Sequence, residues 1–109
     1  MKVHKTLGPG LLESVYEACL CYELSKRGIA FRRQIELPVR YDEILIEAGF
    51  RIDVVVDECV IVELKAVDTI IPVHEAQLLT YMKLANVRLG FILNFNVALM
   101  KHGIKRMAL

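Results

Sequence analysis

A chain of 109 residues, of which 55% are hydrophobic and 25% charged, predicts one folded domain over residues 1–109 and excludes an intrinsically disordered protein. The formal charge of +1 does not by itself select a partner, because the local placement of charge decides what binds. No apolar run approaches the roughly 20 residues that cross a bilayer. The three cysteines lack metal-ligand spacing. We therefore expect reduced thiols, a cytoplasmic location and no membrane association.

Proline and glycine mark several of the predicted element boundaries. Pro9 suits a first helical position and Gly28 the residue past a helix end. Pro38 lies in a β-rich segment, where we expect it at a sheet edge or a bulge, and Gly49 predicts a bend in the next strand. The predicted elements are a helix from Pro9 to about Gly28, strands over 31–41, 44–56 and 60–65, a helix from Pro72 to about 85 or 86, a strand over 89–94 and a short strand from about Gly103.

The order of these elements is α-β-β-β-α-β with one further strand. Helices that alternate with strands in this way predict an α/β (α+β) fold, in which a mixed central sheet has both faces largely covered. Only eight residues precede Pro9, so any helix ahead of this segment is expected to be short.

Three charged side chains interrupt two apolar strands in the middle of the chain. Asp53 lies in the strand over 44–56, and Glu63 and Lys65 share one face of the following strand, because side chains alternate sides along a strand. Removing an unpaired carboxylate from water is costly. Three ionisable groups in a half-buried sheet therefore indicate a site that a cation completes.

The turn between the two strands decides whether Asp53 and Glu63 meet. A two-residue Asp57-Glu58 turn pairs Asp53 with Val62 and sends Glu63 to the opposite face. A three-residue turn that includes Cys59, or a bulge, pairs Asp53 with Glu63 instead. A common site thus requires an irregular turn or a bulge.

The chemistry of the two carboxylates favours a divalent metal ion. At about 4 Å they repel by roughly 4 kcal/mol at an effective dielectric of about 20, and a cation turns that repulsion into attraction. Oxygen-only ligands favour Mg²⁺ or Mn²⁺ over zinc and leave water positions for a substrate phosphate. Lys65 could orient or deprotonate an attacking water, or stabilise phosphoryl charge. The alternative is a structural ion pair at a solvated strand end.

Four sequence elements resemble the PD-(D/E)XK nuclease superfamily and, more narrowly, its GxxExxY family. They are the segment from Gly10 to Tyr16, Asp53 in the second strand, Glu63-Leu64-Lys65, and the Gln77-x-x-x-Tyr81 pattern of the second long helix. The resemblance covers about residues 7–107. It departs from the usual pattern before the strand aspartate, where Arg51-Ile52 replaces a proline.

The resemblance implies a restriction-endonuclease-like αβββαβ core and a role for each matching residue. Asp53 and Glu63 would bind Mg²⁺ or Mn²⁺, with the Leu64 carbonyl as a third ligand, and Lys65 would be the catalytic cation. Glu13 would bind the metal or a metal-bound water; it also suits the first turn of a helix on electrostatic grounds alone. Gln77 would hold Lys65 or a phosphate, and Tyr81 would stack or hydrogen-bond nearby. Tyr16 and His74 are expected to be structural.

These roles make a metal-dependent nuclease acting on DNA, or on RNA, the first hypothesis, and a homodimer a further expectation, because one small site cuts one strand. The alternatives are a catalytically silent nuclease-fold module that binds nucleic acid or a protein partner, and a purely structural dimer. Basic residues are expected to gather along one groove; they are Arg32, Arg33, Arg40, Arg51, Lys101, His102, Lys105 and Arg106.

Overall fold

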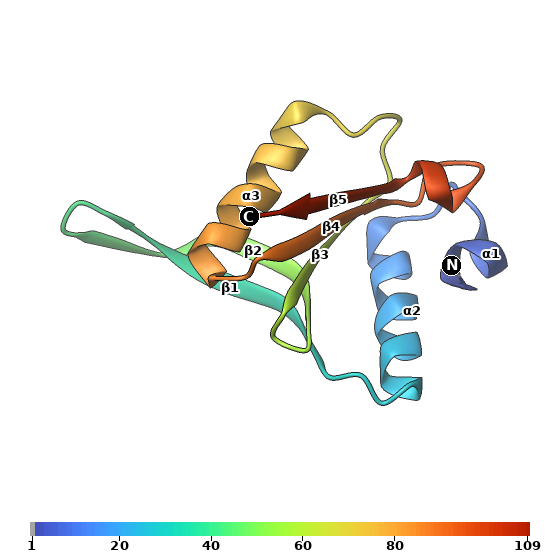
Figure 1. Cartoon of the computed structure of the whole chain (residues 1–109), viewed down its shortest axis with the longest axis horizontal. Helices are drawn as coiled ribbons and strands as arrows, with labels where there is room; N and C mark the ends of the chain where they lie inside the picture. The colour runs from blue at the N-terminus through green and yellow to red at the C-terminus, as the bar shows by residue number, and fades with distance from the viewer. Residues whose placement is uncertain (1) are drawn as a thin grey trace.

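A computed structural model describes residues 2–109, apart from the side chain of residue 48. Its elements are α1 (Lys2–Leu7), α2 (Glu13–Lys26), β1 (Phe31–Tyr41), β2 (Ile44–Val56), β3 (Val60–Lys65), α3 (Pro72–Ala85), β4 (Leu89–Asn94), the 3-10 helix η1 (Met100–His102) and β5 (Ile104–Ala108). Figure 1 shows these elements in chain order. Within this part of the chain, none of the helices is long and apolar enough to span a membrane.

The five strands form one mixed sheet in the order β1-β2-β3-β4-β5. β3 and β4 run parallel and are connected through α3, since a parallel pair needs a crossover, and the other neighbours are antiparallel. The predicted α/β (α+β) class with an αβββαβ core is confirmed, and β5 is the predicted additional strand. α1, a single helix of six residues, precedes this core.

The predicted start of the first long helix is wrong by four residues. α2 begins at Glu13 and not at Pro9, because Gly8 and Gly10 adopt positive φ angles of 69° and 97° that a helix does not contain. The Tyr16 hydroxyl holds this loop: it donates to the Gly8 carbonyl oxygen (2.6 Å) and accepts from the Leu11 amide (3.1 Å). The segment from residue 8 to 12 is therefore an ordered loop that leads into α2.

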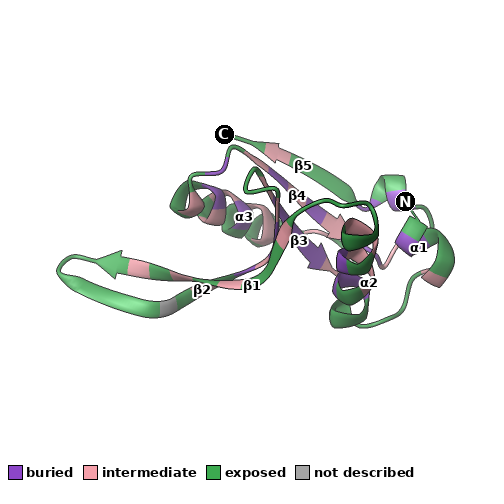
Figure 2. Cartoon of the chain, turned by 90° about the horizontal axis from the view of Figure 1, so that it is seen from below, coloured by how far each residue is buried: buried purple, intermediate pink, exposed green. Residues whose placement is uncertain are grey.

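Apolar side chains cover the sheet on both faces. α2 packs on one face through a buried cluster that includes Tyr16, Val54, Val62, Leu64 and Phe95. α3 packs on the other through Ile52, Ile61, Leu78, Met82 and Ile92. Figure 2 shows the buried residues concentrated in β3, β4 and the sheet-facing sides of these helices. β2 and β3 are thus held between two helices where their charged residues lie.

The β1–β2 hairpin continues beyond the body of the protein as a two-stranded arm, which we define as residues 39–46 (Figures 1 and 2). The register shifts between Leu37 and Val39, so Pro38 lies at an irregularity in an edge strand, as the sequence predicts. Gly49 lies opposite this shift, and a Cβ atom there would collide with the Val39 side chain. The absence of a side chain at Gly49 thus allows β1 and β2 to approach closely at this shift.

Candidate active site

The β2–β3 turn has the irregular form that a common carboxylate site requires. Asp57 and Glu58 have positive φ angles of 52° and 55°, and the Cys59 amide donates to the Val56 carbonyl oxygen (3.0 Å). Val54 and Val62 are the last pair of the β2–β3 register, and Asp53 and Glu63 are the next residues of the two strands. Of the two forms that the sequence leaves open, a three-residue turn and a bulge, the structure has the three-residue turn, since Val56 pairs with Val60.

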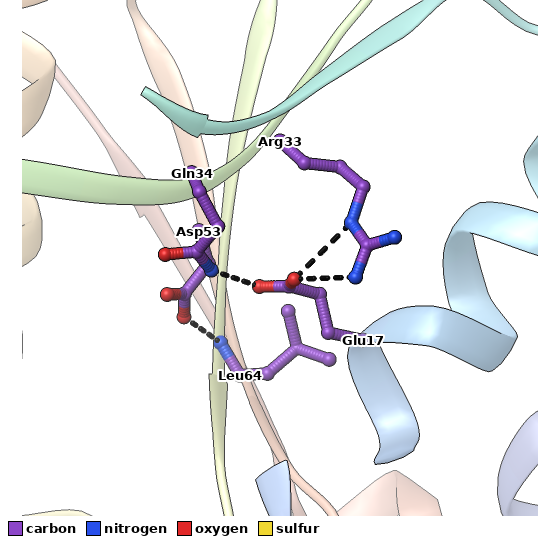
Figure 3. Close-up of polar contacts among 5 residues, drawn as sticks. All are labelled: Glu17, Arg33, Gln34, Asp53 and Leu64. Carbon is purple, nitrogen blue, oxygen red and sulfur yellow. Dashed lines mark hydrogen bonds and ion pairs between the residues drawn. The ribbon is translucent and has the colours of Figure 1, made fainter. Parts of the chain in front are cut away.

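Asp53 and Glu63 exchange hydrogen bonds with each other's strands. The Asp53 amide donates to Glu63 Oε1 (3.2 Å), and the Leu64 amide donates to Asp53 Oδ2 (3.0 Å). The second of these contacts is drawn in Figure 3. At this point of the β2–β3 pair, the backbone amides donate to carboxylate oxygens in place of backbone carbonyl oxygens. Side chains therefore join the two strands here.

Burial and like charge make Glu63 the most perturbed acid of the pair. Glu63 is 8% exposed. Burial, followed by the charge of Asp53 beside it, raises the pKa of Glu63 from 4.5 to about 9, and the Lys65 ammonium lowers it only in part. Near neutral pH the metal-free pair thus carries a proton on Glu63. A bound cation would favour the ionised form of both carboxylates and so displace that proton.

Lys65 ends β3 beside this pair. Among residues 2–109, no ion pair joins its ammonium to a carboxylate. The structural ion pair that the sequence left open is therefore not formed in the described chain.

Asn94 fixes the chain immediately after Lys65. It is 2% exposed and lies beside Lys65 in the parallel β3–β4 pair. Its amide group donates to the Val67 carbonyl oxygen (2.8 Å) and accepts from the Val67 amide (3.1 Å), while the Phe95 amide donates to the Lys65 carbonyl oxygen (2.9 Å). The sequence analysis missed Asn94; the signal was an amide side chain at the end of a buried strand.

A cleft of about 420 Å³ opens at Asp53, between α2 and the sheet. Its walls are polar because they combine the first turns of α2 with the irregular part of β1 and β2; the lining residues are Glu13, Ser14, Glu17, Gln34, Arg51, Asp53 and Leu64. Glu13 is exposed on its rim. The structure thus brings Glu13 and Asp53 to one cleft.

Glu17, which the sequence analysis did not select, is the buried acid of this cleft. It is 6% exposed and accepts hydrogen bonds from Arg33 Nη2 (2.9 Å) and Arg33 Nε (3.2 Å). It also accepts from the Gln34 side-chain amide, and Figure 3 shows these contacts together. Its place one helical turn after Glu13 was the available signal.

The residues predicted on α3 differ in their surroundings. Tyr81 lies near the carboxylates: burial, then the charges of Glu63 and Asp53, raise the pKa of its hydroxyl, and its ring packs edge-on against Phe50 at 5.3 Å. Gln77 is exposed, and among the described residues no hydrogen bond involves its side chain. His74 Nδ1 accepts from the Ile71 amide (3.2 Å) at the start of α3, which is the expected structural role.

The expected single basic groove is not formed. The basic residues are divided among elements, since β1 and β5 are opposite edges of the sheet: Arg32, Arg33 and Arg40 lie on β1, Arg51 on β2, Lys101 and His102 on η1, and Lys105 and Arg106 on β5. Arg32 and Arg33 are paired with Glu58 and Glu17, and Lys105 with Glu75. Arg51 alone among the eight lines the cleft at Asp53. Linear order did not reveal this division, because it depends on strand order.

The donors at Asp53 and Glu63 suit a hard divalent cation. Both are carboxylates, burial and then the charge of Asp53 favour proton binding at Glu63, and the cleft that Asp53 lines leaves room for water and a phosphate. Across residues 2–109, no three His, Cys, Asp or Glu side chains are close enough to hold a metal ion together. A two-carboxylate site completed by main-chain oxygen and water is the arrangement that fits.

The sequence model of the PD-(D/E)XK nuclease superfamily matches residues 1–107. No curated protein and no solved structure matches the chain. The matched span includes both carboxylates, Lys65 and the helices on either side of the sheet. Nucleases of this superfamily typically use divalent metal ions.

Proposed function

Because this chain belongs to the PD-(D/E)XK nuclease superfamily, we propose that it is a Mg²⁺- or Mn²⁺-dependent nuclease that hydrolyses phosphodiester bonds of DNA. One observation carries the proposal: Asp53 and Glu63 lie side by side in an irregular junction, next to the free ammonium of Lys65 and an open polar cleft. Such a junction holds a proton that a divalent cation would displace.

Each residue of the site has a proposed role. Asp53 and Glu63 hold the metal with the Leu64 carbonyl oxygen, and Glu13 reaches it through water. When bound, the metal supplies Lewis-acid polarisation of the scissile phosphate. Lys65 orients the attacking water or stabilises the charge of the phosphoryl group.

Two residues of α3 complete the proposal. Tyr81, near both carboxylates, contacts the substrate beside them. Gln77, exposed one helical turn before Tyr81, meets a substrate phosphate. We also assign the chain to the GxxExxY branch, since each residue of that pattern has a place in the structure. Gly10 adopts a positive φ in the loop before α2, Glu13 lines the cleft, and Tyr16 is in the core and bonds the loop.

A cleavage assay with purified protein tests the proposal. We expect Mn²⁺ to support cleavage of DNA and excess chelator to stop it. Asp53→Asn and Lys65→Ala should each lower the rate by at least 10²-fold, because they remove a metal ligand and the catalytic cation. Lys26→Ala, an exposed lysine at the end of α2, is the matched control and should leave the rate unchanged. Cleavage that survives Asp53→Asn would defeat the proposal.

A catalytically silent module that binds nucleic acid or a protein partner is the second candidate. The division of basic residues among several elements favours it, because a divided charge offers no continuous track for a phosphate backbone. Salt-dependent DNA or RNA binding without products, over single-stranded, duplex and branched substrates, would support this reading. Cleavage of RNA in place of DNA would change the substrate and retain the site.

A homodimer remains part of the proposal, because one site cuts one strand and a two-fold arrangement presents two. Sedimentation of the wild-type protein with and without duplex DNA measures the stoichiometry. A monomer on a duplex that is cut in both strands would contradict it.

A further inference from the structure

β1 contains a backbone conformation that a strand does not ordinarily contain. Gln34 has a φ angle of 49°, in the left-handed region that costs a non-glycine residue energy. The β1–β2 register includes Arg33 with Val54 and Ile35 with Ile52, and it steps over Gln34 and Asp53 between them. The strained residue is therefore opposite the proposed metal ligand.

The left-handed residue changes which face of the sheet each side chain takes. Arg33 reaches Glu17 on the α2 side, whereas Ile35 and Ile52 pack with the cluster under α3. Strict alternation would place Arg33 and Ile35 on one face. Both strands thus switch faces at Gln34 and Asp53, and the Asp53 amide is left to bond Glu63 and not β1.

Glu17 is the group that holds Gln34 in this conformation. Its buried carboxylate receives the Gln34 amide on one oxygen and the Arg33 guanidinium on the other (Figure 3). Arg33 balances the charge, so the buried acid is paired. Residues held in strained conformations by their surroundings cluster at functional sites.

We propose that Glu17, acting through Gln34, is a positioning residue that breaks the β1–β2 ladder at Asp53 and so aims the Asp53 carboxylate at a divalent cation. This inference rests on the proposed metal site and adds to it the device that orients one ligand. Groups behind a metal ligand commonly change metal affinity by about 10- to 100-fold.

Titration calorimetry with Mn²⁺ on the full chain tests the device. Glu17→Gln keeps the shape but removes the charge, and we expect it to weaken Mn²⁺ binding by roughly 10-fold. Gln34→Val should weaken it at least as much, because a β-branched residue resists a positive φ. Gln34→Gly should stay within about threefold of wild type, because glycine adopts this conformation without cost.

The Arg32–Glu58 pair provides a matched control. Arg32 is the residue of β1 before Arg33, and it forms a two-point ion pair with Glu58 that is exposed; neither residue lines the cleft. Glu58→Gln should leave Mn²⁺ affinity unchanged. Thermal unfolding of every variant separates affinity from stability.

Three outcomes distinguish the positioning role of Glu17 from the proposed metal site on which it rests. A wild-type protein that binds no Mn²⁺ defeats both. Wild-type binding with unaltered affinity in Glu17→Gln, even where the melting temperature falls, overturns the positioning role alone. Equal losses in Gln34→Gly and Gln34→Val would show that the amide side chain, and not the backbone conformation, serves the site.

Discussion

Glu63 shows how one buried carboxyl group couples stability to pH. Folding raises its pKa from 4.5 to about 9, chiefly through burial and then through Asp53. The native state therefore binds more protons than the unfolded state between these values. Its contribution to stability is lost progressively as pH rises through that window, and a bound cation would restore it.

Glu63→Gln should thus stabilise the metal-free protein more at alkaline than at acidic pH. We expect the gain in free energy of unfolding to be about 2 to 3 kcal/mol larger at about pH 8 than at about pH 6, from 1.36 kcal/mol per pH unit. Urea denaturation at both pH values measures it. The exposed Glu58→Gln is the control, and a gain independent of pH would show that Glu63 is ionised in the native protein.

Tyr16 has the structural role that the sequence analysis expects. It is fully buried, stacks on Phe95 at 4.3 Å and ties down the loop before α2. Tyr16→Phe keeps the stacking and removes both hydrogen bonds, so we expect a loss of about 1 to 2 kcal/mol. Chemical denaturation measures this loss. Tyr22→Phe, at a 65% exposed position, should cost almost nothing.

At the scale of elements, the strand ends around the site are fixed by side chains as much as by the ladder. The β2–β3 turn brings Glu63 beside Asp53. The Asn94 side chain bonds the backbone of Val67 and so holds the segment that leads from β3 to α3. Local propensity predicts the bounds of these strands well, since β-branched residues fill them. It does not predict the links between strand ends, which join residues far apart in sequence.

Removing the Asn94 link should loosen the segment between β3 and α3. Asn94→Ala leaves the Val67 amide and carbonyl without their partner, and we expect the free energy of unfolding to fall by about 2 to 3 kcal/mol. Hydrogen exchange should show faster exchange at residues 66–71. Asn96→Ala is the matched control, because its side-chain contact with Asp68 is long (3.5 Å) and exposed. Equal effects of the two changes would contradict the assigned role of Asn94.

At the scale of the whole molecule, the proposed metal site links binding to folding. A ligand that binds only the native state stabilises it by about 2.7 kcal/mol at 100 times its Kd. Mn²⁺ at that excess should therefore raise the melting temperature of the wild-type protein. Asp53→Asn should remove this shift. A shift of equal size in Asp53→Asn would place the bound metal elsewhere.

The sequence by itself determined the order of elements, the bounds of β1 to β4 and the requirement for an irregular turn or a bulge if Asp53 and Glu63 are to meet. It could do so because alternation, β-branching and charge within apolar runs are local properties of the chain. Only the tertiary structure decided that Glu17 is buried against Gln34, that Tyr81 lies near the carboxylates while Gln77 is exposed, and that the basic residues are divided. Those outcomes depend on which segments, far apart in sequence, pack together and exclude water. Burial is a property of the folded molecule, so no single stretch of sequence can predict it.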